Sequence, residues 1–189
     1  MNFANKITIF RILSTPFFVG TILYYSPQRD YLRFLSLGVF VLASLSDAID
    51  GYIARTKGQK TKAGTILDPL ADKLLLSSAF ICLYAKESLN SGLNLPLWIV
   101  LVVISRDLII LLGSVVIFIV KQNLILVPTK WGKFTTALQM LAIISALLRL
   151  EITGYIWLVT AVLTVISGIQ YIRGGFKVLY VNENHGFNN

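Results

Sequence analysis

The sequence has almost none of the residues that bind soft metal ions or form disulfides. Its 189 residues include one cysteine, Cys82, and one histidine, His185. A single cysteine cannot form an internal disulfide, and we expect Cys82 to be a small packing residue within an apolar run. The histidine lies in a polar tail. These absences argue against a zinc, copper or iron–sulfur centre within the chain.

Charged residues are also scarce. Only 14% of the residues are charged, whereas 56% are hydrophobic, and the mean hydropathy is +0.74. An ordinary soluble domain carries about 25% charged residues. Six apolar stretches are long enough, or nearly so, to cross a hydrocarbon core of roughly 30 Å as helices. They are Ile7–Tyr25, Phe34–Ile53, Thr65–Ala85, Leu95–Val120, Phe134–Leu148 and Tyr155–Ile172. The sequence therefore predicts an all-α integral membrane protein with six transmembrane helices.

The charges that are present are unevenly distributed. Lys and Arg number 17 against 9 Asp and Glu, and the net charge of +8 lies in short loops between the predicted spans. Charge in that position suits an anionic lipid leaflet better than a nucleic acid, so we expect no nucleic-acid partner. Six spans place both termini on one side. The other side keeps only Arg29, Arg33, Lys86 and Arg149. By the positive-inside rule both termini are cytoplasmic, in the cell membrane.

The chain is predicted to form one domain. We expect residues 1–181 to make up the membrane domain and the polar residues 182–189 to form a disordered tail. Arg11 lies inside the first apolar stretch, so we interpret that stretch as a retained helix and not as a cleaved signal peptide.

Four aspartates lie where a membrane protein tolerates them least. Asp47 and Asp50 are spaced i, i+3, and Asp68 and Asp72 are spaced i, i+4, so on helices each pair projects from one face. Clustered like charges in a membrane imply a cation among them. Carboxylate oxygens are the ligands that Mg²⁺ and Mn²⁺ prefer. The pattern predicts a divalent-cation site in a polar cavity open to the cytoplasm, with phosphoryl transfer as its chemistry.

An ion-relay transporter is the alternative from another functional class, because intramembrane carboxylates also mark ion pathways. Two features favour the enzyme. Gly51, Ala54 and Gly64 are interleaved with the aspartates and leave room for a phosphorylated ligand. In addition, the predicted cluster lies at one membrane face, and the sequence has no sign of an inverted repeat.

The run from Asp47 to Asp72 resembles the signature of the CDP-alcohol phosphotransferase family, D-x-x-D-G-x-x-A-R followed after a short spacer by G-x-x-x-D-x-x-x-D. The N-terminal Asn5-Lys-Ile-Thr8, with Arg11 and Pro16, is similar to the family's first element. The resemblance covers nearly the whole chain.

This resemblance implies transfer from a CDP-linked lipid with release of CMP, two Mg²⁺ or Mn²⁺ ions per active site, and a homodimer. Asp47, Asp50 and Asp68 would be metal ligands, and Asp72 would both touch a metal and act as the general base. Positions matching those that line the nucleotide and its diphosphate are Asn5, Thr8, Gly51, Ala54, Arg55, Thr61 and Gly64.

Two resemblances disagree about the acceptor. The continuation Leu67–Leu74 resembles the members that join CDP-diacylglycerol to sn-glycerol 3-phosphate, the phosphatidylglycerophosphate synthases. Ser105-Arg106-Asp107 is instead similar to cardiolipin synthases, whose acceptor is phosphatidylglycerol. We predict the first activity, with cardiolipin synthesis as the alternative.

Basic residues near the predicted cavity favour a phosphorylated acceptor. The candidates for binding its phosphate are Arg106, Lys130, Lys133 and Arg173. The alternative is that Arg106 pairs with an aspartate and that the lysines bind lipid headgroups. Asp30 and Asp107 are expected to be helix caps or solvated groups.

Overall fold

The computed structural model describes residues 3–57, 62–86, 89, 94–121 and 130–180, and the side chains of 9–46, 70–86, 89, 94–113, 115 and 131–174. Within these residues there are six long α-helices, one short 3₁₀ helix (η1, Pro27–Arg29) and no β-strand. The helices are α1 (Phe3–Leu23), α2 (Tyr31–Lys57), α3 (Lys62–Ala85), α5 (Leu97–Lys121), α6 (Lys130–Leu148) and α7 (Thr153–Tyr180). Each contains one of the six predicted stretches or nearly all of it, so the all-α prediction is confirmed. The tail 182–189 lies outside the described residues.

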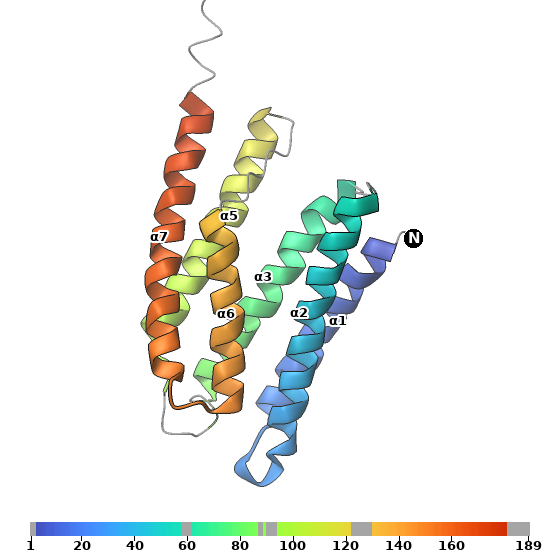
Figure 1. Ribbon diagram of the computed structural model, residues 1–189, viewed down its shortest axis with the longest axis vertical. Helices are drawn as coiled ribbons and strands as arrows, with labels where there is room; N and C mark the ends of the chain where they lie inside the picture. The colour runs from blue at the N-terminus through green and yellow to red at the C-terminus, as the bar shows by residue number, and fades with distance from the viewer. Residues whose placement is uncertain (1–2, 58–61, 87–88, 90–93, 122–129, 181–189) are drawn as a thin grey trace, which may run out of the picture.

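The helices form an up-and-down bundle (Figure 1). α1 packs against α2 and α3, and α7 packs against α5 and α6. α3 joins these two halves through α5 and α6, and α2 also contacts α6. Because the direction alternates, the start of α1, the end of α2, the start of α3 and the end of α7 all lie at the upper end of Figure 1. The signature aspartates lie on the α2 and α3 segments at that end.

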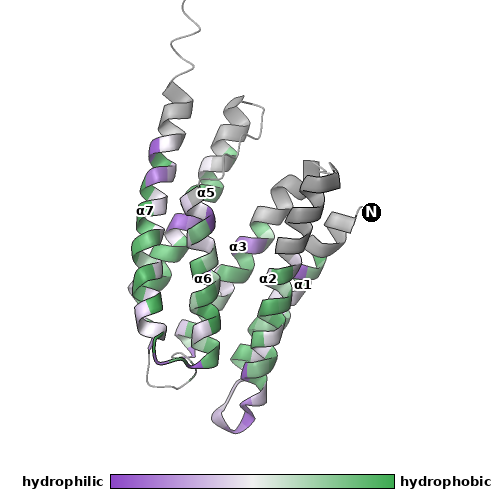
Figure 2. Cartoon of the chain, viewed as in Figure 1, coloured by the Kyte–Doolittle hydropathy of each residue, from purple (hydrophilic) through white to green (hydrophobic). Residues whose placement is uncertain are grey.

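The distribution of side chains is that of a membrane protein. Large apolar side chains are exposed on every helix, for example Leu13 on α1 and Leu112 on α5, which are 65% and 64% exposed. The interior contains an apolar core together with buried polar groups such as Arg11, Arg106 and Gln139. Figure 2 colours the residues by hydropathy, and hydrophobic residues make up most of the length of the described helices. A surface of this kind needs lipid or a partner to cover it, because water would solvate it poorly.

Among the described residues, two helices are long and apolar enough by themselves to cross a bilayer. The qualifying segments are Trp131–Leu148 in α6 and Thr153–Gly174 in α7, and shorter apolar segments occupy Ile9–Leu23 and Tyr31–Ser46. By length and composition, these two helices could cross a membrane. The full count of six spans and the cytoplasmic position of the termini stay predictions.

Apolar packing and short polar contacts both hold the bundle together. Phe18 of α1 meets Phe40 of α2, with ring centroids 5.7 Å apart. Between the same helices the Ser36 hydroxyl donates a hydrogen bond to Thr21 Oγ1. Cys82 is buried in the apolar core, as expected for a packing residue. Small hydroxyl groups let neighbouring helices approach closely and satisfy their polar atoms internally.

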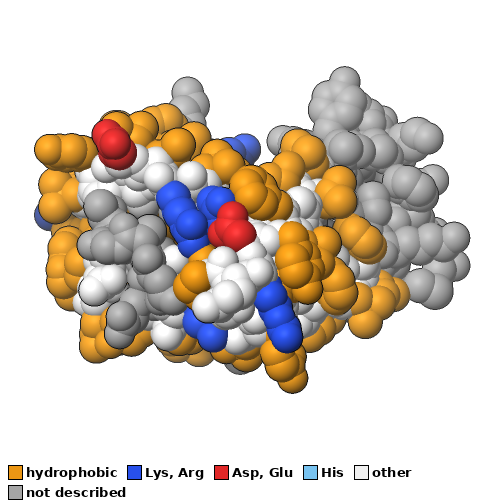
Figure 3. All heavy atoms as spheres, turned by 90° about the horizontal axis from the view of Figure 1, so that it is seen from below, with side chains coloured by type: hydrophobic (Ala, Val, Ile, Leu, Met, Phe, Trp, Pro, Cys, Tyr) orange, Lys and Arg blue, Asp and Glu red, His pale blue; other side chains and the backbone are white. Residues whose placement is uncertain are grey.

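The lower end of the bundle carries a compact charged network. Arg33 donates two hydrogen bonds to the carboxylate of Asp30, at 3.0 and 2.8 Å, and a third to the carbonyl of Leu147, at 2.7 Å. Arg149 lies 3.5 Å from the same carboxylate. The hydrogen bonds from Arg33 hold the pKa of Asp30 below its usual value. Asp30 directly precedes α2, at a helix end as expected, but the partners of its carboxylate are Arg33 and Arg149. Figure 3 shows this end, where basic side chains surround an acidic group.

Arg149, which belongs to this network, has an unusual backbone conformation. It ends α6 with a φ of 55°, a conformation that usually favours glycine. Its N–H bonds to the carbonyl of Ala146, and the next N–H bonds to the carbonyl of Ser145, which together make a Schellman ending. The Arg149 side chain donates to the carbonyl of Leu89, at 3.0 Å, and to the hydroxyl of Tyr25. These contacts explain why arginine occupies a position where glycine would be less strained.

The side chain and the backbone of Arg149 can be separated by mutation. Arg149→Ala loses the side-chain hydrogen bonds and leaves the carbonyl of Leu89 without this donor, so we expect a loss of about 1–3 kcal/mol in stability. Arg149→Gly loses the same contacts but relaxes the backbone, and its loss should be about 1 kcal/mol smaller. Thermal unfolding in detergent measures both. The control is Arg29→Ala, an exposed arginine at the same end. A glycine variant less stable than the alanine variant would contradict this explanation.

Candidate active site

The signature residues occupy two helix segments at one end of the bundle. Asp47 and Asp50 lie in the last part of α2, and Asp68 and Asp72 lie in the first part of α3. Both pairs are therefore helical, as their spacing predicted. α1 packs against both helices, so its N-terminal segment lies at the same end (Figure 1).

Most of the predicted metal and nucleotide ligands cannot be placed at the level of side chains. Thr61 lies outside the described residues. Described only by their helical backbone are Asn5, Thr8, Asp47, Asp50, Gly51, Ala54, Arg55, Gly64, Asp68 and Lys130. Among the described side chains, no three His, Cys, Asp or Glu residues come together. The metal site stays a prediction. The donor types fit it, because the two segments carry four aspartates and no cysteine, histidine or methionine.

Asp72 is the one signature aspartate with a described side chain. It is partly buried and takes part in a polar interaction. The next residue, Lys73, points into the centre of the bundle. Its ammonium nitrogen lies 3.0 Å from Oδ1 of Asp107 on α5, and its side chain is 12% exposed. The helix that carries the predicted base is thus tied to α5 by a buried ion pair.

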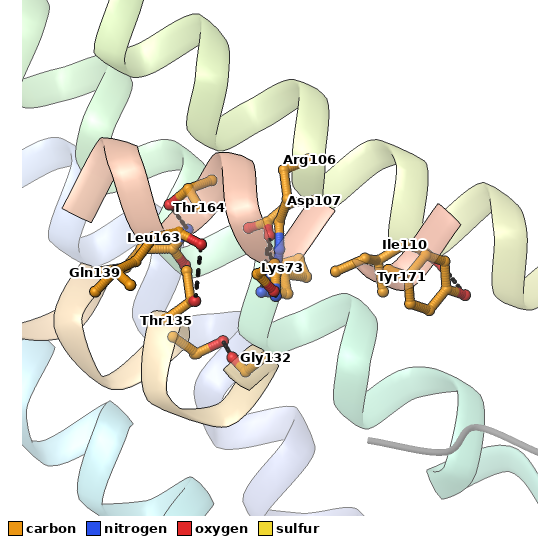
Figure 4. Close-up of polar contacts among 12 residues, drawn as sticks. Lys73, Arg106, Asp107, Ile110, Gly132, Thr135, Gln139, Leu163, Thr164 and Tyr171 are labelled. Atoms are coloured by element: carbon orange, nitrogen blue, oxygen red, sulfur yellow. Dashed lines mark hydrogen bonds and ion pairs between the residues drawn. The ribbon is translucent and has the colours of Figure 1, made fainter. Parts of the chain in front are cut away.

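Asp107 also binds Arg106, its neighbour on α5. Nη1 of Arg106 donates to the same Oδ1 at 2.8 Å, and Nη2 donates to the hydroxyl of Ser167 on α7 at 2.8 Å. Arg106 and Asp107 are 5% and 2% exposed. Figure 4 shows the side chains of Lys73, Arg106 and Asp107 pointing toward one another from α3 and α5. We call these three residues, together with Ser167, the central cluster.

The central cluster carries two formal positive charges and one negative charge. Buried charges are tolerated when they are paired and hydrogen-bonded, and an excess of one positive charge favours an anionic ligand. Three polar atoms of the cluster have no hydrogen-bond partner among the described residues: Nε of Arg106, Oδ2 of Asp107 and Nζ of Lys73, which makes only the ion pair with Asp107. The cluster therefore has both the charge and a free donor to receive an anion such as a phosphate.

The central cluster bears on two predictions made from the sequence, one for Arg106 and one for Asp107. The alternative prediction that Arg106 pairs with an aspartate is confirmed, because Arg106 binds Asp107. This contact leaves Nε of Arg106 without a partner among the described residues. The expectation that Asp107 caps a helix or is solvated is wrong. Asp107 lies in the middle of α5, where backbone N–H groups already bond within the helix, and Lys73 and Arg106 satisfy its charge.

The other acceptor candidates lie farther from the interior. Lys133 on α6 and Arg173 on α7 are both exposed, and the side chain of Lys130 is not described. The structure thus places Arg106 in a defined polar cluster but does not bring Lys133 and Arg173 into it. Sequence reasoning missed Lys73, Asp107 and Ser167 as members. Charged residues next to Asp72 and Arg106 within apolar stretches were the available signal for the first two.

Known proteins resemble this chain over nearly its full length. Residues 1–166 match the family model described as CDP-alcohol phosphatidyltransferase. A CDP-diacylglycerol–glycerol-3-phosphate 3-phosphatidyltransferase of Aquifex aeolicus is 34% identical, covering 95% of this chain and 99% of the relative. One of the same name from Haemophilus influenzae is 34% identical over 88% and 89% of the two chains. A probable phosphatidylglycerophosphate synthase of Mycobacterium tuberculosis is 30% identical over 93% and 82%.

The family match spans most of the chain and includes both aspartate segments, α1 and the central cluster except Ser167. Together with the helical placement of the signature, it confirms the resemblance first inferred from residues 47–72. The chain belongs to the CDP-alcohol phosphatidyltransferase family.

Proposed function

We propose that this protein transfers the phosphatidyl group of CDP-diacylglycerol to sn-glycerol 3-phosphate, giving phosphatidylglycerol phosphate and CMP. The observation that carries the proposal is the near-complete match to relatives named for this reaction, at 34% identity and 95% coverage of this chain in one case. The central cluster supports a phosphorylated acceptor, because it offers a buried excess of positive charge within the helix bundle.

The donor would bind at the end of the bundle where α2 ends and α3 begins. Asp47, Asp50, Asp68 and Asp72 would hold two divalent cations, Mg²⁺ or Mn²⁺. When bound, such cations neutralise a diphosphate and stabilise CMP as the leaving group. Arg55 would supply a planar set of donors to phosphate oxygens. The remaining residues proposed to line the CDP moiety are Asn5, Thr8, Gly51, Ala54, Thr61 and Gly64.

The acceptor would approach from the side of α5. Arg106 would bind its phosphate through donors that the protein leaves free, and Lys130, Lys133 and Arg173 would add positive charge at the entrance. Asp72 would take the proton of the attacking hydroxyl, so that the oxygen attacks phosphorus as its proton leaves. Because Lys73 is fixed to Asp107, the base and the acceptor-binding arginine would be held in one frame.

The orientation and assembly are part of the proposal. Both termini would be cytoplasmic, and the active site would open toward the cytoplasm, where glycerol 3-phosphate is soluble. Two of the four basic residues assigned to the opposite side, Arg33 and Arg149, are engaged with Asp30 and with carbonyl groups, which reduces their weight as topological signals. The enzyme would act as a homodimer, with membrane lipid covering its remaining apolar surface.

Cardiolipin synthesis is the second candidate, and one feature favours it. The Arg106-Asp107 pair resembles that group, and phosphatidylglycerol also carries a phosphate that Arg106 could bind. Membership in a transferase family makes ion transport the weaker interpretation.

Divalent cations should be essential. Asp47→Ala and Asp68→Ala should be nearly inactive, because each removes a proposed ligand and the remaining carboxylates then repel one another when a cation is lost. CMP release with and without EDTA, followed by addition of Mg²⁺ or Mn²⁺, measures the requirement. Glu151→Ala, an exposed acidic residue at the opposite end, is the control. Full activity of either aspartate variant in EDTA would rule out the metal assignment.

Asp72→Asn should separate the base from the ligands. The substitution keeps the shape and removes the basicity, so turnover should fall about 10²- to 10⁴-fold. Binding of CDP-diacylglycerol should survive in large part, and equilibrium binding of the donor beside single-turnover kinetics tests this. Equal losses in binding and turnover would mean that Asp72 acts chiefly as a metal ligand.

The acceptor is tested by offering one alcohol at a time. Purified wild-type protein with CDP-diacylglycerol and Mn²⁺ should release CMP with glycerol 3-phosphate. Arg106→Ala should raise the KM for that acceptor about ten- to more than a hundredfold, the cost of roughly 1.5–3 kcal/mol for a lost charge-assisted bond. The KM for CDP-diacylglycerol should change much less. CMP release with phosphatidylglycerol and none with glycerol 3-phosphate would favour the second candidate.

A further inference from the structure

Two consecutive residues of α7, Ser167 and Gly168, lie against Arg106. The Ser167 hydroxyl, which is buried, accepts a hydrogen bond from Nη2 at 2.8 Å. A Cβ added at Gly168 would lie 3.4 Å from Cγ of Arg106 and 3.9 Å from its Cβ. Ser167 thus binds the charged end of the arginine, and the absence of a side chain at Gly168 leaves space for its aliphatic part.

Residues of α5 and α3 hold the other side of the Arg106 guanidinium. Nη1 bonds to Oδ1 of Asp107 at 2.8 Å, and that oxygen also meets Lys73. Two of the three guanidinium nitrogens therefore have protein partners on two different helices. Nε has none among the described residues, although Arg106 is 95% buried. The arginine is held in one orientation, and Nε is its one nitrogen without a partner among the described residues.

We propose that Ser167 and Gly168 are positioning residues that orient Arg106 so that its free Nε donor receives the phosphate of the acceptor. This inference rests on the proposed function, since it assigns these residues to the acceptor and not to CDP-diacylglycerol. A guanidinium donates from a rigid plane, so a small rotation misdirects every remaining N–H bond. Fixing that plane before the ligand arrives lowers the entropy lost on binding.

Ser167→Ala tests the polar half of this arrangement. It removes a neutral acceptor and leaves the charges of the central cluster unchanged. We expect the KM for glycerol 3-phosphate to rise about three- to tenfold, the range of one ordinary hydrogen bond. The KM for CDP-diacylglycerol should stay within twofold. The control is Ser145→Ala, also buried, whose hydroxyl donates within α6 to the carbonyl of Ala142.

Gly168→Val tests the steric half. It adds two methyl groups beyond a Cβ that would already contact Arg106, so the arginine should be displaced and the acceptor KM should rise more than about tenfold. Gly168→Ala should change it less than threefold, because 3.4 Å is an ordinary contact distance. Gly174→Val is the control on the same helix, where an added Cβ meets nothing within 4 Å.

Equilibrium binding of inorganic phosphate and of glycerol 3-phosphate, followed by calorimetry, makes the test independent of turnover. Wild-type protein should bind both ligands. Ser167→Ala and Gly168→Val should each weaken binding by the same factors as those expected for the acceptor KM. Both variants should unfold at temperatures close to those of their controls. If wild-type protein binds phosphate in this way but releases no CMP with glycerol 3-phosphate, the proposed function fails and the positioning role stands. Phosphate binding that is absent in wild type, or equal in wild type and both variants, would overturn the positioning role. Equal increases in both substrate KM values would do the same.

Discussion

Asp107 places one carboxylate oxygen between the guanidinium of Arg106 and the ammonium of Lys73, deep within the helix bundle. In a membrane interior the cost of leaving either cation alone is several kcal/mol, so this shared oxygen decides how α3 and α5 can sit against each other. Ser167 extends the constraint to α7. These contacts connect α3, α5 and α7 at one point. Asp72 lies directly beside that point, because it precedes Lys73 on α3.

Paired charges also connect helices at the lower end of the bundle, opposite the signature aspartates. Asp30 accepts two hydrogen bonds from Arg33 and lies near Arg149, whose backbone is held in a left-handed conformation. That network closes the turns between the helices. It carries the same net charge of +1 as the central cluster, but its charged groups are more exposed, and its arginines also donate to carbonyl groups and to the hydroxyl of Tyr25. The contrast with the interior beside α3 is therefore one of burial and hydrogen bonding, because Arg106 is 5% exposed and its Nε has no partner among the described residues.

Much of this architecture could be predicted from the sequence. Long apolar stretches predict helices, because backbone polar groups in lipid must form their hydrogen bonds within the protein. The i, i+3 spacing of Asp47 and Asp50, like the i, i+4 spacing of Asp68 and Asp72, places both carboxylates on one face only if the chain is helical there. The fate of Asp107 could not be predicted in this way. Whether a charged residue is capped, solvated or paired depends on which helix packs opposite, and Lys73 is distant in sequence. Ser167 and Gly168 gave no signal, since small residues are common in membrane helices for reasons of packing alone.

Glycerol 3-phosphate is the acceptor in the proposed reaction. The most direct measurement is mass spectrometry of the lipid formed when purified wild-type protein receives CDP-diacylglycerol, Mn²⁺ and equal amounts of glycerol 3-phosphate and phosphatidylglycerol. We expect phosphatidylglycerol phosphate, formed in step with CMP. Cardiolipin as the product, with no phosphatidylglycerol phosphate, would contradict it.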